Sequence, residues 1–415
     1  LADRFGRRRV FRAGIAIFAA GGTLSAAAPT VEALIAARAF EAIGGACVTS
    51  TSLGLLMMAY PAQMHPRIIA WWSAITMTAG AVGPPIGGLV AGLHWRFVFL
   101  VGLPIASPVA IFGRRLPDNQ QRSTGPLPDL IGAALLAGAI ALVVAGLSNG
   151  PRWRTQDPVL LAACLVLAAI AFAGFLRRCK THPEPILDLA LLRIRQFNAA
   201  NAAMLLFNIG FSAVLLGGPL FMQAVWGFSS AQAGLGYLPG PVVSATVTVL
   251  SARLPIARST AAAIGFLLFA AAALWWALFL GNDPDYWRHY LPGALTMSSG
   301  AGFCIAAMVG LGAAALPERN LSAGTGALNA TRQIGGALGV AIFIAAVGAA
   351  STAGPFRPAY LFAAACGIAA ATVTGLAFGI GPVRRNRSAA RHPPAGAAAG
   401  QEEQPPERGV QHPLG

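Results

Sequence analysis

The amino-acid sequence predicts an all-α membrane protein whose chain crosses the bilayer many times. Of the 415 residues, 56% are hydrophobic and 10% are charged, and the mean hydropathy is +0.65. A soluble domain usually contains about 25% charged residues. The apolar residues form continuous runs of about 20 residues, the length that a helix needs to cross the hydrocarbon core. Lysine and arginine residues gather in the loops on one side of these runs.

Twelve apolar runs can be marked along the chain. They are continuous and rich in Ala, Leu and Gly, whereas the strands of membrane barrels are about ten residues of alternating polarity. The runs therefore predict helices. They cover residues 10–28, 31–53, 66–92, 97–113, 128–149, 157–177, 197–222, 232–252, 257–280, 289–316, 322–348 and 357–382.

The basic residues predict the orientation of the chain. With residues 1–9 in the cytoplasm and the runs alternating in direction, 22 of the 29 lysine and arginine residues lie on the cytoplasmic side and 5 on the other. Cytoplasmic loops of multispanning proteins carry such an excess. Membrane topology thus accounts for the net charge of +15. Nucleic-acid binding is not expected, because the arginines do not cluster on one soluble face.

The first nine residues, Leu1-Ala2-Asp3-Arg4-Phe5-Gly6-Arg7-Arg8-Arg9, form a short charged turn before the first run. Glycine permits a tight turn, and the aspartate can pair with a nearby arginine or a helix N-terminus. The string resembles the cytoplasmic loop signature of the major facilitator superfamily. A plain positively charged loop is the alternative. The resemblance implies a cytoplasmic gating loop whose contacts hold two helices together and are lost when the carrier rocks. The residues of this loop are Asp3, Arg4, Gly6, Arg7 and Arg8.

In that family the loop joins the second and third helices, so the first run would be the family's third helix. The twelve runs are then twelve of the fourteen helices of the drug:proton antiporter branch (EmrB/QacA type), whose first two helices would lie before Leu1. The resemblance implies the major facilitator fold. In this fold two six-helix bundles flank a central cavity, and the branch inserts two further helices between the bundles.

The same resemblance divides the chain into five segments. The tail contains few large apolar residues, a composition typical of disorder. The segments are an N-terminal bundle lacking two helices (1–113), two inserted linker helices (114–178), a cytoplasmic loop (179–196), a C-terminal six-helix bundle (197–383) and a cytoplasmic tail (384–415).

The third run contains the string Gly80-Ala81-Val82-Gly83-Pro84-Pro85-Ile86-Gly87-Gly88, which resembles the family's antiporter motif. Small residues four apart permit close helix packing, and prolines remove backbone donors and are expected to kink the helix. A kinked, closely packed helix can seal one side of a carrier while the other side opens. A generic helix contact is the alternative. The residues expected to act here are Gly80, Gly83, Pro84, Pro85, Gly87 and Gly88.

The second run contains two charged residues, Arg38 and Glu41, in a string that resembles the family pattern R-x-x-Q-G-x-G-A-A. Glu41 stands where glutamine is usual. Charges inside a span are costly and usually face a partner or a water-filled cavity, and residues three apart share a helix face. Two interpretations stay open: an internal ion pair, or a Glu41 that binds a proton or a cationic substrate.

Another charged residue, Arg332, lies about ten residues inside the eleventh run, near the expected midplane. Asn329 and Gln333 are close to it on the same helix, and the string resembles a late-helix pattern of the same branch. These three residues are candidates for the wall of the cavity. An arginine that is satisfied by neighbouring carbonyl groups is the alternative.

No string typical of an enzyme is present: the sequence has no P-loop, no H-E-x-x-H and no G-x-S-x-G. Neither enzymatic activity nor ATP-driven transport is therefore expected. Four of the five cysteines lie in apolar runs, and Cys179 lies in a basic loop. No two cysteines have the spacing typical of metal ligands, so no metal, cofactor or disulfide framework is expected.

The resemblance implies a secondary transporter of the bacterial inner membrane that exports amphipathic small molecules in exchange for protons. Its partners would be the lipid bilayer, the substrate, protons and, in some systems, a periplasmic adaptor protein. Two alternatives stay open. One is a dedicated exporter of a single metabolite, and the other is a non-transporting truncated remnant or scaffold.

Overall fold

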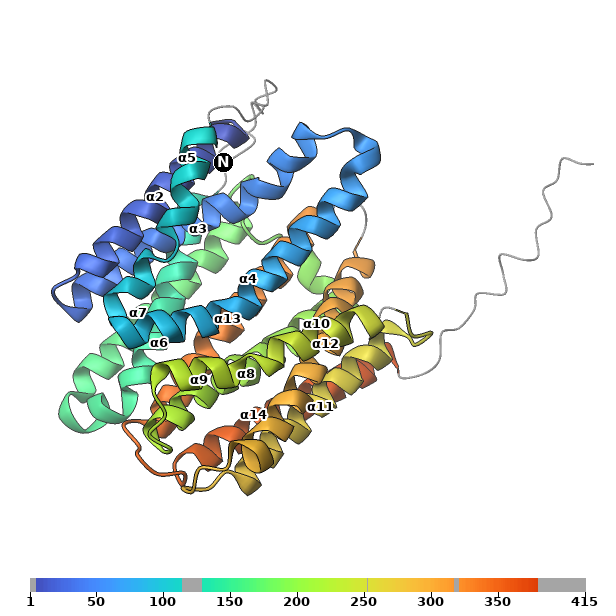
Figure 1. Ribbon diagram of the computed structural model, residues 1–415. Helices are drawn as coiled ribbons and strands as arrows, with labels where there is room; N and C mark the ends of the chain where they lie inside the picture. The colour runs from blue at the N-terminus through green and yellow to red at the C-terminus, as the bar shows by residue number, and fades with distance from the viewer. Residues whose placement is uncertain (1–4, 114–128, 252, 317–320, 380–415) are drawn as a thin grey trace, which may run out of the picture.

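The computed structural model describes residues 5–113, 129–251, 253–316 and 321–379. Within these ranges the chain is helical and contains no β-strand, and nine of the helices found there are long and apolar enough to cross a membrane. Each of the twelve predicted runs contains a helix. The predicted all-α, polytopic membrane fold is confirmed, and the long helices lie roughly side by side (Figure 1).

The first half of the chain is built around a helical hairpin. Helices α2 (Arg7–Ala27) and α3 (Val31–Ala59) pack along their length. Thr30 begins α3, because its side chain accepts a hydrogen bond from the Ala33 N–H. Helix α4 (His65–Leu93) follows, and then the short pair η2 (Trp95–Leu100) and α5 (Leu103–Phe112), both of which pack against α2.

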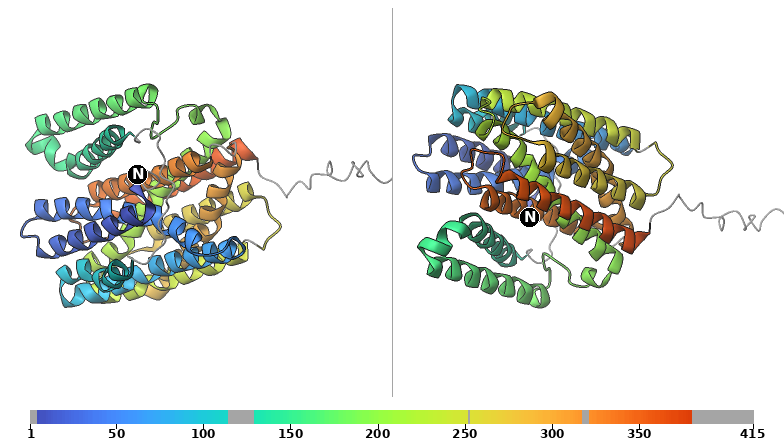
Figure 2. Two further views of the ribbon diagram at one scale, coloured as in Figure 1. Left: turned by 90° about the horizontal axis from the view of Figure 1, so that it is seen from above. Right: turned by 90° about the horizontal axis from the view of Figure 1, so that it is seen from below.

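Helices α6 (Leu130–Gln156) and α7 (Pro158–Thr181) form a second hairpin. Figure 2 shows it to one side of the other helices, where α6 contacts α13. Helix α7 extends into the segment that was expected to be a loop, so Cys179 lies buried in its last turn rather than in the loop. The helix ends just before Pro183, because a proline ring disfavours the helical conformation in the residue that precedes it, here His182.

The second half contains six membrane-length segments. Proline at position 239 interrupts one of them, and a capping box between Ser229 and Gln232 begins it. The elements are α8 (Arg195–Ala224), α9 (Ser230–Tyr237), α10 (Pro239–Ser251), α11 (Arg258–Phe279), η5 (Tyr286–Tyr290), α12 (Leu291–Ala314), α13 (Leu321–Val347) and α14 (Phe356–Phe378).

The largest buried cluster lies in this second half. Phe207 of α8 contacts Phe266 and Phe269 of α11, with ring centroids 5.3 Å apart in both pairs. Gly210 and Gly367 leave room for the Phe269 ring, because a Cβ at either position would approach it to about 3 Å. Among the described residues, the buried cluster of the first half is much smaller.

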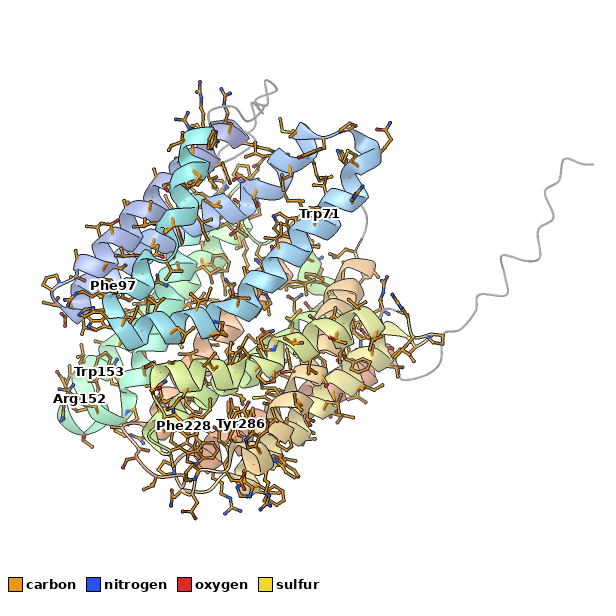
Figure 3. The ribbon with its side chains drawn as sticks, in the orientation of Figure 1. Trp71, Phe97, Arg152, Trp153, Phe228 and Tyr286 are labelled. Carbon is orange, nitrogen blue, oxygen red and sulfur yellow. The ribbon has the colours of Figure 1, made fainter. Side chains whose placement is uncertain are left out.

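The two ends of the molecule differ in composition. We call the end at which α2 begins the basic end; it carries Arg7, Arg177, Arg178, Arg195 and Arg258. At the opposite end Phe97, Trp153, Phe228 and Tyr286 lie along one edge, whereas Trp71 of α4 lies nearer the basic end (Figure 3). Aromatic residues are enriched at membrane interfaces, so these positions fit a protein that lies across a bilayer.

Candidate functional site

Glu41 lies where α2 and α3 pack closely together. A Cβ on Gly21 of α2 would lie 2.6 Å from the Glu41 Cα, so only glycine fits opposite this residue. One turn further along α2, Ser25 is fully buried. This packing leaves Glu41 6% exposed, although it is a charged residue in the middle of an apolar helix.

Two side chains bind the Glu41 carboxylate. Arg38 donates from Nη1 to Oε2 at 2.7 Å, and the Ser25 hydroxyl donates to the same oxygen at 3.4 Å. The Arg38 side chain remains 52% exposed, and its guanidinium carbon lies 5.5 Å from the centre of the Phe99 ring. The structure thus contains the internal ion pair that was one of the two interpretations. It leaves the binding of a proton or cation by Glu41 as a prediction.

Arg332 lies on a polar and exposed face of α13. Asn329, Arg332 and Gln333 are all exposed. The Asn329 side-chain oxygen accepts from Arg332 Nη2 at 3.1 Å and from Nε at 3.4 Å. This interaction is with a side-chain amide rather than with the backbone carbonyl groups of the alternative interpretation. The three residues share one face, and the structure does not bring them into contact with Glu41.

The antiporter string lies in the second half of α4, which continues through both prolines. Figure 1 shows α4 changing direction part-way along its length. Gly88 touches α9: a Cβ there would lie 2.5 Å from the Ser230 carbonyl oxygen and 3.1 Å from the Gly234 Cα. A Cβ on Gly83 or Gly87 would meet nothing within 4 Å in the part of the chain that the structure describes, so Gly88 makes the close approach.

The α4–α9 contact joins the two halves of the molecule near the opposite end. Gly234 faces back toward α4, since a Cβ there would lie 3.0 Å from the Pro84 carbonyl oxygen and 3.4 Å from the Pro85 Cα. The helices pack closely here, whereas α4 and α10 share few contacts. Gly80 lies in α4 closer to the basic end, where Figure 1 shows α4 and α10 diverging.

The predicted gating loop is described only in part. Gly6 has a positive φ of 91° directly before α2, a conformation that favours glycine. Arg7 and Arg8 form the first turn of α2, and the Arg7 guanidinium lies against Gly54 of α3. Asp3 and Arg4 lie outside the described residues.

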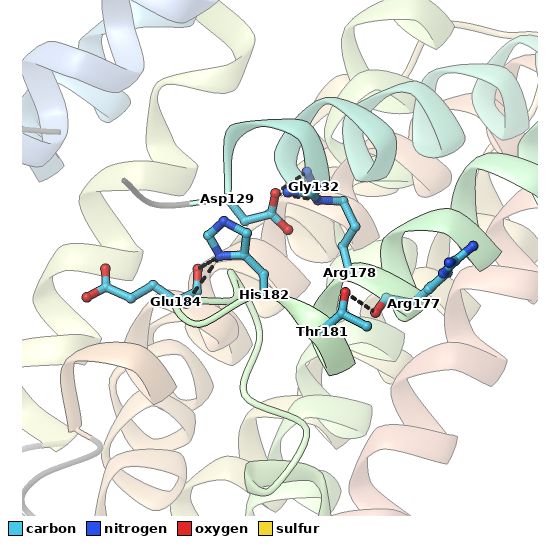
Figure 4. Close-up of polar contacts among 7 residues, drawn as sticks. All are labelled: Asp129, Gly132, Arg177, Arg178, Thr181, His182 and Glu184. Atoms are coloured by element: carbon cyan, nitrogen blue, oxygen red, sulfur yellow. Dashed lines mark hydrogen bonds and ion pairs between the residues drawn. The ribbon is translucent and has the colours of Figure 1, made fainter. Parts of the chain in front are cut away.

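An ion pair at the basic end joins the α6–α7 hairpin. Asp129 begins α6 by accepting from the Gly132 N–H at 2.8 Å, and the same oxygen accepts from Arg178 Nε at 2.7 Å (Figure 4). Burial acts to raise the pKa of the Asp129 carboxyl. The Gly132 N–H and the Arg178 guanidinium outweigh this effect, and the pKa lies below its ordinary value. No sequence pattern indicates this pair, because its partners lie 49 residues apart.

In the long helices, Arg38, Glu41 and Arg332 are the described charged residues that lie more than six positions from a helix end. Among all the residues that the structure describes, no group of three His, Cys, Asp or Glu side chains could hold a metal ion. Charged groups at such depth usually line a water-filled path or pair with one another. The fold and these residues define a polytopic membrane protein with charged groups deep within its helices.

The chain belongs to the Major Facilitator Superfamily, whose sequence pattern it matches over residues 1–340. Membership of a transporter family, with relatives named for resistance and export, identifies a protein that is not an enzyme. This confirms the superfamily that the opening loop predicted.

Several named relatives are similar to most of the chain. A methylenomycin A resistance protein of Bacillus subtilis (strain 168) is 32% identical over 347 residues, which cover 82% of this chain and 74% of the relative. The cephamycin export protein CmcT of Amycolatopsis lactamdurans is 30% identical over 370 residues, which cover 86% of this chain and 74% of the relative. The drug efflux pump JefA of Mycobacterium tuberculosis (strain ATCC 25618 / H37Rv) is 29% identical over 352 residues, which cover 82% of this chain and 67% of the relative.

Solved structures share the fold. An auto-inhibited peptide transporter of the POT family superposes with a TM-score of 0.61 at 17% identity, covering 91% of this chain and 83% of that one. The human organic anion transporter MFSD10 (TETRAN) superposes with a TM-score of 0.55, also at 17% identity, covering 90% and 78%. These similarities support the major facilitator fold and say nothing of the substrate.

Proposed function

We propose that this protein exports amphipathic small molecules from the cell in exchange for protons. Relatives named as drug-resistance and export proteins support efflux. The positions of the charged residues support coupling to an ion gradient, because charges inside a membrane span are costly and usually serve a function. The observation that carries the proposal is the buried Glu41 carboxylate, held by Arg38 and Ser25 in the interior of the hairpin.

The proposed orientation places the basic end in the cytoplasm, as the positive-inside rule predicts. The α4–α9 contact then lies on the outer side, and the divergence of α4 from α10 opens toward the cytoplasm. Alternating access would rock the two halves about a site near the midplane. The closely packed Gly88 and Gly234 would separate in the outward-facing state.

We also propose that the chain belongs to the fourteen-helix drug:proton antiporter branch. The support is the antiporter string of α4 and the Arg38–Glu41 string of α3, both of which resemble patterns of that branch. In this assignment α2 is the third helix of the branch, and α6 and α7 are its inserted pair.

Replacement of Glu41 by glutamine tests the coupling. Glu41→Gln keeps the shape and one hydrogen-bond acceptor but removes the group that would release a proton. We expect dye efflux driven by a pH gradient to fall strongly and to lose its dependence on that gradient. The assay is fluorescence of a transported dye in cells or everted vesicles over a range of pH.

Glu32→Gln is the matched control, because Glu32 is an exposed carboxylate in the first turn of the same helix. It should leave the pH dependence of efflux unchanged. If the Glu41→Gln protein exports the dye at the wild-type rate at every pH tested, Glu41 is not the coupling group.

A second candidate is the export of one metabolite. It is favoured by relatives whose names refer to single compounds, methylenomycin A and cephamycin. Competition separates the two functions: a multidrug exporter should be inhibited by several unrelated dyes, and a dedicated exporter by compounds of one structural class.

A further inference from the structure

We infer that the substrates of this transporter carry a negative charge and that Arg332 selects for it. The inference rests on the proposed export function and narrows its class of substrate to amphipathic anions, such as carboxylates. Two kinds of observation support it: the balance of charges inside the long helices, and the surroundings of the Arg332 guanidinium.

The deep charges do not cancel. Of the three that the described helices carry far from their ends, Arg38 and Arg332 are positive and Glu41 is negative. Glu41 is already paired with Arg38, with 2.7 Å between Nη1 and Oε2, although the Arg38 side chain is half exposed. One positive charge, that of Arg332, therefore remains without a counter-charge among the described residues.

The helices around Arg332 contain no carboxylate that could neutralise it. Helix α13 packs against α6, α8, α12 and α14. Neither α13 nor any of these four contains Asp or Glu between its first and last residue. The polar residues that α8 presents to α13 are neutral: Asn201 accepts from the Thr331 hydroxyl at 2.8 Å, and Asn208 and Ser212 lie beside Gly335 and Gly336.

The guanidinium is oriented and still accessible. Asn329 accepts from Nε and one terminal nitrogen, which fixes the plane of the group. A guanidinium has five N–H donors, so donors remain for a ligand. Arginine matches a carboxylate through two parallel hydrogen bonds. Asn329 is therefore a positioning residue, and Arg332 is the residue that would contact the substrate.

The position of Arg332 fits a substrate path. It lies eleven residues after Leu321, about 17 Å along α13 at 1.5 Å per residue. Thr331 and Gly335 face α8, whereas Asn329, Arg332 and Gln333 are exposed. A polar face at this depth is costly against hydrocarbon, so we expect it to line a water-filled path through the protein. An unpaired cation there is stabilised when an anion binds.

Two dyes with the same ring system but opposite charge test the inference. Fluorescein is an anion at neutral pH, and a rhodamine ester is a cation on the same xanthene core. Binding of each dye to the purified chain in lipid nanodiscs is measured by fluorescence polarisation. We expect fluorescein to bind more tightly than the rhodamine ester, and Arg332→Gln to weaken fluorescein binding by about tenfold to hundredfold.

Further variants separate the role of the charge from misfolding. Arg332→Lys keeps the charge and should retain part of the fluorescein affinity. Arg332→Glu should lose fluorescein binding and gain affinity for the rhodamine ester, a gain that a misfolded protein would not show. Arg152→Gln is the matched control, because it neutralises an arginine at the opposite end that bonds Gln156, and it should change neither affinity.

Each contrary result has a distinct meaning. If the wild type binds the rhodamine ester and not fluorescein, the inference about charge is wrong while the export function stands. If fluorescein binds equally well to the wild type and to Arg332→Gln, Arg332 is not the selecting residue. If the wild type binds neither of the two dyes, that result contradicts both the proposed function and the inference.

Discussion

At the scale of single residues, the structure explains how a carboxylate is buried in an apolar hairpin. Arg38 shares a helix face with Glu41, so its part in the ion pair could be inferred from spacing alone. Ser25 and Gly21 could not be inferred, because they lie on the neighbouring helix and meet Glu41 only when α2 and α3 pack together. The residues that bury the charge depend on tertiary structure.

The Asp129–Arg178 pair predicts a pH dependence of the α6–α7 hairpin. The pKa of Asp129 in the folded protein is lowered from its ordinary value of 3.8. A lowered pKa means that the ionised carboxylate stabilises the fold above the ordinary value and that this stabilisation is lost as the pH falls through the lowered value. Acid should therefore loosen the hairpin at its basic end. Amide hydrogen exchange of residues 129–133 and 178–182 measures this.

Arg178→Gln should produce the same loosening at neutral pH, because it removes the partner of Asp129. Arg177→Gln is the control: Arg177 is exposed, and Figure 4 shows its side chain pointing away from Asp129. Similar exchange rates in the two variants would mean that the ion pair does not hold the hairpin.

At the scale of helices, the glycines of α4 are not equivalent. The spacing of the small residues in the antiporter string places them on shared faces, which predicts that they act together. The structure distinguishes them, since Gly88 touches α9 and Gly83 does not touch any described side chain or neighbouring helix backbone within 4 Å. This difference arises from the position of α9, which the α4 sequence does not contain.

Gly88→Val is predicted to weaken the α4–α9 contact. The new side chain would meet the Ser230 carbonyl and Gly234, and overpacking of this kind typically costs about 1–3 kcal/mol. The halves should separate more often at the opposite end. A cysteine introduced at Ala231, beside this contact, should then react faster with a membrane-impermeant maleimide.

Gly83→Val is the matched control from the same helix and should leave the labelling rate unchanged. Slower labelling of the Gly88→Val protein, or equal rates in both variants, would contradict the assignment of this contact as the outer closure.

At the scale of the whole molecule, the twelve apolar runs were predictable because the length, composition and loop charge of membrane spans are constrained by the bilayer. The superfamily was predictable from the resemblance of the opening loop to a motif of that family. The interior breaks were less predictable. The separation of α9 from α10 at Pro239, the π-helix η5 before α12 and the extension of α7 to Thr181 depend on local packing and on proline positions. Helix number follows from hydropathy, whereas helix continuity does not.

The aromatic cluster of the second half predicts that stability depends much more on its buried rings than on exposed rings elsewhere in the molecule. Phe269→Ala should lower the free energy of unfolding by about 3–5 kcal/mol, because it empties a site at the centre of the aromatic cluster of the second half. Phe172→Ala should have little effect, since Phe172 of α7 is 47% exposed. Thermal unfolding in detergent, followed by tryptophan fluorescence, compares the two. Equal shifts in Tm would contradict the prediction.

The basic end also affects which membrane suits this protein. Arginines near a surface of anionic lipid each gain about 1 kcal/mol of attraction, and Arg7, Arg177, Arg195 and Arg258 all lie at this one end. In a bilayer of zwitterionic lipid that attraction is absent, and the depth and tilt of the helices are set by their apolar length and aromatic residues alone. Vesicles used to reconstitute the transporter should therefore contain phosphatidylglycerol or another acidic phospholipid, and the proportion chosen will influence how the protein inserts.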